Sequence, residues 1–142
     1  MRSMKMDQTS IRPRLWIALP TAIVVGILSV FLFFLFMVLY GHVIDPGHEE
    51  LFYHEAANRF GPIASIIGGI PLMYLAGRWI GKRVGPQLAI KAALLVWLVY
   101  FLVDVTIVAA SGILLSLLPM VGISFSTKLI AVYLGGRSSK RN

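Results

Sequence analysis

The chain has 142 residues, of which 58% are hydrophobic and 13% are charged, and it carries a formal net charge of +7 with no cysteine. A soluble domain has about a quarter of its residues charged, so this composition indicates a single membrane domain surrounded by lipid. The absence of cysteine excludes disulfides, thiolate chemistry and cysteine-based metal sites. No nucleic-acid partner is expected, because the basic residues flank apolar runs instead of forming a stripe.

The first predicted span covers residues 15–40, which contain no charged side chain. A signal peptide has an apolar region of only about 7–15 residues, so this longer run is expected to stay in the protein as a transmembrane helix. The polar and basic segment that precedes it is expected to remain outside the membrane.

Residues 46–58 predict a short interfacial helix in the first outer loop. Asp45 is a suitable N-cap and Pro46 suits the first helical position. The helix is expected to end before Gly61. The segment 41–60 holds all three histidines and four of the six acids.

Two interpretations of this loop stay open. His48, His54 and Glu50, completed by His42 or Asp45, could bind a divalent metal, because imidazole and carboxylate suit Zn²⁺ and related ions, or could sense pH. The other interpretation is a solvated, capped helix at the membrane surface, which is favoured because charge runs are commoner than sites. No other cofactor is predicted.

The second predicted span, residues 61–80, is rich in small side chains. Small residues four apart let two membrane helices approach closely, so this is expected to be the packing helix of the bundle, kinked at Pro71. The spacing occurs at Gly61, Ser65, Gly69, Gly77 and Gly81.

The third and fourth predicted spans are residues 87–110 and 113–134. We expect Tyr100 to belong to the belt of aromatic residues at the membrane surface. Lys128 is expected to extend toward the cytoplasmic end of its helix, because long basic side chains reach for water.

Asp104 is a candidate functional residue, because a carboxylate at membrane depth is costly. By depth, the favoured interpretation is an Asp104–Arg59 ion pair that joins the second and third spans. The alternative is a protonatable Asp104 that acts in transport. A single buried acid without a chain of partners makes a poor proton path.

The distribution of basic residues predicts the orientation. Ten of the 13 Lys and Arg side chains lie in the N-terminal segment, the middle loop and the C-terminal tail. Because such residues concentrate in cytoplasmic loops, both termini are expected in the cytoplasm. The predicted fold is an all-α membrane bundle of four transmembrane helices, up-down-up-down.

The segment 41–83 contains Asp45-Pro46-Gly47-His48, Arg59-Phe60-Gly61-Pro62 and Gly69-Ile70-Pro71-Leu72. In these parts the chain resembles a group of small bacterial four-helix inner-membrane proteins to which no function is assigned. The resemblance implies a bacterial inner membrane and no catalytic residue.

Three classes of function stay open. The first is a structural or accessory protein that binds a second copy or another membrane protein through the small residues of the second span. The second is a small oligomeric transporter or channel that uses Asp104. The third is a metal-binding sensor or enzyme that uses His48 and His54, and an enzyme is the less favoured of these classes.

Overall fold

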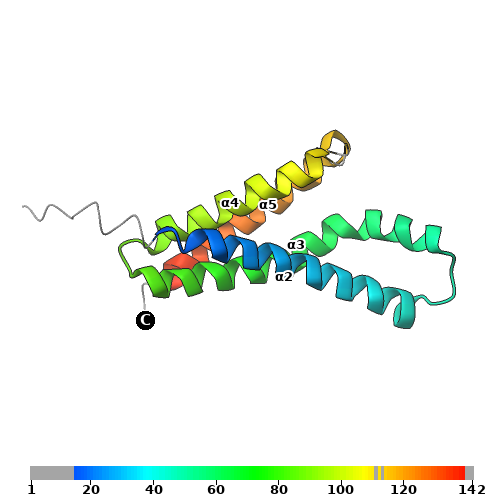
Figure 1. The fold of residues 1–142 in the computed structure, drawn as a ribbon, viewed down its shortest axis with the longest axis horizontal. Coiled ribbons are helices and arrows are strands. Elements are labelled where there is room, and N and C mark those ends of the chain that lie inside the picture. Colours follow the sequence, from blue (N-terminus) through cyan, green and yellow to red (C-terminus); the bar gives the residue numbers. More distant parts are fainter. Residues whose placement is uncertain (1–14, 111, 113, 140–142) are drawn as a thin grey trace, which may run out of the picture.

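The computed structural model describes residues 15–110, 112 and 114–139. They form long helices joined by short connections (Figure 1). Four of these helices are long and apolar enough to cross a membrane, which confirms the predicted all-helical fold with four candidate spans. The elements in chain order are α2 (Ala18–Leu39), the π-helical turn η1 (Tyr40–Ile44), α3 (Glu50–Val84), α4 (Ala89–Ala110) and α5 (Leu114–Ser138).

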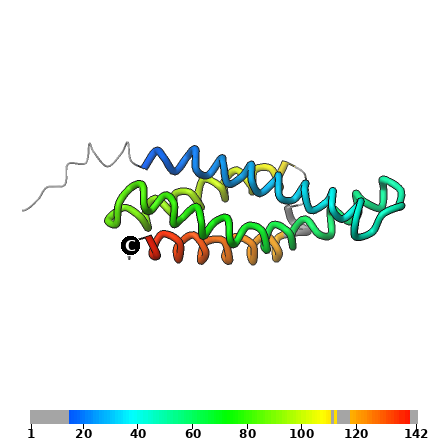
Figure 2. Tube along the Cα trace, turned by 90° about the horizontal axis from the view of Figure 1, so that it is seen from below, coloured from blue at the N-terminus to red at the C-terminus, as the bar shows by residue number. Residues whose placement is uncertain are grey.

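The bundle is forked. Successive helices run in opposite directions, and all four lie together at one end, which holds the α3–α4 connection and the end of α5 (Figures 1 and 2). We call this the closed end. Toward the other end, the forked end, the hairpin α2–α3 separates from the hairpin α4–α5 (Figure 1). The side of the membrane that each end faces stays a prediction.

One continuous helix, α3, replaces the two helices predicted for residues 46–58 and 61–80. It has 35 residues and contains Pro62 and Pro71. Prolines are tolerated in membrane helices where neighbouring groups satisfy the freed carbonyls. The helix starts at Glu50 and not at Pro46, because Gly47 has φ 95°, a left-handed conformation that does not continue a helix.

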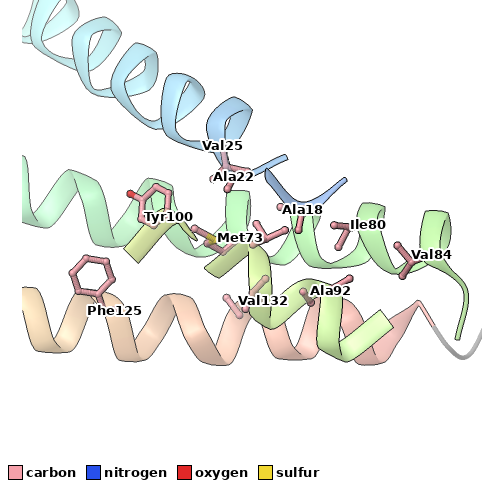
Figure 3. Close-up of a cluster of buried hydrophobic side chains, with 14 residues drawn as sticks. Ala18, Ala22, Val25, Met73, Ile80, Val84, Ala92, Tyr100, Phe125 and Val132 are labelled. Carbon is pink, nitrogen blue, oxygen red and sulfur yellow. The ribbon is translucent and has the colours of Figure 1, made fainter. Parts of the chain in front are cut away.

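The core lies mostly toward the closed end and consists mainly of small and medium-sized side chains (Figure 3). Lipid gives no hydrophobic reason for membrane helices to associate, so close packing of small residues must hold them together. Alanines are the most frequent residues of the buried cluster. The buried cluster contains Ala18, Ala22, Val25, Met73, Ala76, Ile80, Val84, Ala92, Ala93, Val96, Tyr100, Phe125, Ala131 and Val132.

The backbones of α3 and α5 approach each other directly. A Cβ atom on Gly77 would collide with the carbonyl oxygen of Val132, and one on Gly135 would collide with the carbonyl oxygen of Tyr74. Gly135 lies in this contact, and α5 continues to Ser138, beyond the predicted end of the span at residue 134.

The small residues predicted for helix packing mostly face this same contact. Gly69 lies against Lys128, Gly77 against Val132, and Gly81 against Ser139, while Gly61 faces Phe33 of α2. Ser65 hydrogen-bonds with Lys128. Helices of the same chain therefore cover this face of α3.

Candidate functional site

Polar side chains from all four candidate spans meet at about the middle of the bundle. We call this group the polar cluster. Tyr100, near the midpoint of α4, lies at its centre: its hydroxyl accepts a hydrogen bond from Lys128 of α5, and Ser29, Ser65 and Asp104 are near neighbours. The polar cluster contains Ser29 of α2, Ser65 of α3, Tyr100 and Asp104 of α4, and Lys128 of α5.

Lys128 is completely buried, with 0% of its surface exposed. Its Nζ donates hydrogen bonds to Ser65 Oγ (2.8 Å) and to the Tyr100 hydroxyl (3.1 Å). The ammonium also lies 4.9 Å from the centroid of the Tyr100 ring and 5.6 Å from that of Phe125. Its stem crosses α3 at Gly69, where any Cβ atom would occupy the position of Lys128 Cε.

Asp104 supplies the opposite charge. Its carboxylate is partly buried and interacts electrostatically with Lys128 and with Tyr100. A buried ammonium that has only hydroxyl acceptors would carry a large desolvation cost, which a nearby carboxylate reduces. The polar cluster thus contains one positive group, held by two hydroxyls, and one negative group near it.

The predicted partner of Asp104 lies elsewhere. Arg59 is exposed, and within the described part of the chain the ion pairs are His48–Asp45 and His54–Glu50, not Asp104–Arg59. Lys128 is the positive group that interacts electrostatically with Asp104, although the ion pairs of the described residues do not include Asp104–Lys128 either.

The prediction that Lys128 extends toward the cytoplasmic end of its helix is wrong, for a reason of helix geometry. In an α-helix, side chains lean toward the N-terminus. Lys128 therefore leans toward the start of α5, and Asp104 leans toward the start of α4. Because α4 and α5 run in opposite directions (Figure 1), the two side chains lean toward each other.

A cavity of about 850 Å³, open on one side, lies beside the polar cluster, between α2, α3 and α4. Its walls are mainly apolar and include Phe33, Phe36 and Ile67. The polar residues along it are those of the polar cluster except Lys128: Ser29, Ser65, Tyr100 and Asp104. Pockets for small molecules in proteins have volumes of about 300–1,000 Å³ and a similar mixture of apolar walls and few polar groups.

The histidines predicted as metal ligands form separate pairs. His48 Nε2 hydrogen-bonds with Asp45 Oδ1 (2.9 Å), while His54 Nε2 lies 3.6 Å from Glu50 Oε1. Within residues 15–110, 112 and 114–139, no group of three or more His, Asp or Glu side chains is arranged to hold a metal ion. The structure therefore does not bring His48, His54 and Glu50 together as one ligand set.

His42 and Tyr53 instead help to order the connection between α2 and α3. His42 Nδ1 hydrogen-bonds with the carbonyl oxygen of Val38 (2.9 Å). The Tyr53 hydroxyl donates to the carbonyl oxygen of Asp45 (2.9 Å) and accepts from the backbone N–H of His48 (3.3 Å). These hydrogen bonds hold the connection between α2 and α3 in one conformation, which is a structural role.

Sequence reasoning missed part of the polar cluster. Ser29 was not singled out, Ser65 was assigned to helix packing alone, and Tyr100 was assigned to the surface belt, although it is buried in the core. The available signal was that polar side chains occur near the middle of all four spans, where each is costly unless it finds a partner. Comparison of the chain with protein-family models, with curated proteins and with solved structures finds no match.

Proposed function

We propose that the protein binds an amphipathic small molecule inside the membrane and serves as a small transporter for it. One observation carries this proposal: polar side chains from three spans line an apolar cavity of about 850 Å³, and the buried Lys128 of the fourth span bonds two of them from behind. In this proposal the apolar walls hold the body of the molecule, and the polar cluster holds its polar group.

Helix packing alone does not require these polar residues. The contact between α3 and α5 is made by glycines, at which the backbones approach closely, and such contacts suffice to associate membrane helices. Ionisable side chains at membrane depth cost several kcal/mol and typically mark the pathway of an ion or substrate. Asp104 and Lys128 therefore favour a binding role over a purely structural one.

The position of the cavity suits transport. It is lined by residues of both hairpins, and α2–α3 separates from α4–α5 toward the forked end (Figure 1), so a change in the angle between the two hairpins would change access to it. The accessory role finds less support, because α5 already covers most of the small-residue face of α3.

Glycines along the cavity allow a direct test. Gly26 and Gly68 line the cavity, and a Cβ atom on either would meet no atom within 4 Å. Gly26→Leu and Gly68→Leu therefore fill the cavity without a collision at the backbone. Gly122→Leu is the matched control, because Gly122 is equally unobstructed but lies on α5, away from the cavity lining.

The assay uses the purified protein in lipid nanodiscs and two probes of nearly equal shape and opposite charge, tetraphenylphosphonium and tetraphenylborate. Native mass spectrometry of the same protein in mild detergent detects any small molecule that copurifies. We expect saturable binding of at least one probe, weakened on the order of tenfold or more, about 1.4 kcal/mol, by each cavity-filling variant and unchanged by Gly122→Leu. If neither probe binds and nothing copurifies, or if the cavity-filling variants bind as well as the control, the proposed function is wrong.

A further inference from the structure

The two charges of the polar cluster are not equally accessible from the cavity. Asp104 lines the cavity. Lys128 does not line it: its side chain is 0% exposed, and its Nζ is bonded to Ser65 and to Tyr100. A molecule in the cavity therefore contacts a carboxylate, while the ammonium stays behind these two residues.

The other polar groups along the cavity are neutral. The Ser29 hydroxyl donates its proton to the carbonyl oxygen of Val25 (2.8 Å), and the oxygens of Ser65 and Tyr100 accept from Lys128. Among the described residues that line the cavity, Asp104 is the charged one. The electrostatic preference of the cavity is thus set by a negative group.

We infer that the molecule bound in this cavity is an amphipathic cation, whose positive group pairs with the Asp104 carboxylate while its apolar groups contact the helices. This inference rests on the proposed function and specifies its ligand. Because water is scarce at this depth, a carboxylate attracts a cation more strongly than it does at a protein surface. A neutral apolar molecule would leave Asp104 with no partner in the cavity.

Lys128 then has a defined role as a competitor. It interacts with the same carboxylate from behind the wall of the cavity, so it weakens the attraction of Asp104 for a bound cation. Removing the two charges should therefore change cation binding in opposite directions. If the charges only stabilised the fold, removing either one would disturb the site in the same direction.

Lys128→Met and Asp104→Asn are the variants that test this role. Methionine is unbranched and can follow the path of the lysine stem past Gly69, while asparagine keeps the shape of the carboxylate without its charge. We expect Asp104→Asn to weaken tetraphenylphosphonium binding on the order of 10- to 100-fold, because the variant loses the attraction between opposite charges at a site poor in water. Lys128→Met should strengthen it roughly tenfold.

The experiment measures equilibrium binding of tetraphenylphosphonium and tetraphenylborate to the full chain in nanodiscs, with empty nanodiscs in parallel to subtract partition into lipid. The unsubstituted protein should prefer the phosphonium ion. The double variant Asp104→Asn/Lys128→Met, which leaves no unpaired charge in the polar cluster, should lose that preference. It provides the test if either single variant does not fold.

The outcomes separate this inference from the proposed function. If both ions bind equally, or the borate binds better, and Gly26→Leu abolishes the binding, the cavity is a binding site but its ligand is not a cation. Retention of phosphonium affinity by Asp104→Asn, or by the double variant, would also overturn the inference. If neither ion binds, the cation inference is overturned as well, and the search for a copurifying molecule decides the proposed function.

Discussion

Gly77→Ala tests the backbone contact between α3 and α5. The new Cβ atom would meet the carbonyl oxygen of Val132 and, at 3.1 Å, the backbone N of Gly136. A backbone carbonyl cannot rotate aside as a flexible side chain can, so the helices must separate along the whole contact. Overpacking costs about 1–3 kcal/mol, and the higher helix propensity of alanine offsets about 1 kcal/mol. We expect a net loss of about 1 kcal/mol, and at most about 2 kcal/mol, in the free energy of unfolding.

Unfolding of the purified protein by SDS in mixed micelles, followed by circular dichroism, measures this change. Gly122→Ala is the control, because its Cβ atom would meet nothing within 4 Å and the substitution should leave stability unchanged or raise it by up to about 1 kcal/mol. If Gly77→Ala is as stable as Gly122→Ala, the backbones of α3 and α5 do not make a close contact at Gly77.

Two further substitutions test individual hydrogen bonds. Tyr53→Phe removes the hydroxyl that bonds Asp45 and His48. Amide exchange in the connection between η1 and α3 should therefore rise about fivefold, as for the loss of about 1 kcal/mol, with the unfolding midpoint unchanged. Hydrogen-exchange mass spectrometry shows whether the faster exchange is limited to this connection, and unchanged exchange would contradict the contact. Trp97→Phe removes the bond from Trp97 Nε1 to the carbonyl oxygen of Phe125 (3.1 Å) and should cost about 1 kcal/mol in the same SDS titration. A loss of less than a few tenths of a kcal/mol would show that this bond does not stabilise the pairing of α4 with α5.

The helices were predictable because their signal is local. An uncharged run such as residues 15–40 must satisfy its backbone groups within itself when it lies in lipid, so only a helix fits. The close packing of α3 was predictable for a similar reason, since glycines four apart lie on one helix face. Which helix covers that face depends on contacts between distant segments, and the spacing alone does not contain them.

The polar cluster was harder to predict, because its members are far apart in the sequence. Depth estimates from the predicted span bounds favoured Arg59 as the partner of Asp104, and they ignored both the lean of side chains toward the helix N-terminus and the length of the lysine stem. The helix start at Glu50 was missed for a different reason. Asp45 and Pro46 are good helix-start residues, but the left-handed conformation of Gly47 places the start beyond them.

The polar cluster takes residues from every span, and this has a consequence for biogenesis. A helix that carries Lys128 or Asp104 inserts into the bilayer at a cost until its partners arrive, and the hairpin α2–α3 alone can supply Lys128 with only one of its two hydroxyl acceptors, Ser65. The hairpin α4–α5 carries both charges together. Insertion of the hairpin α4–α5 should therefore be coupled to its docking onto α2–α3. A chain truncated before α5 would leave Asp104 without its opposite charge in the membrane. Such a chain should be recognised as unfolded by the proteases and chaperones of the membrane.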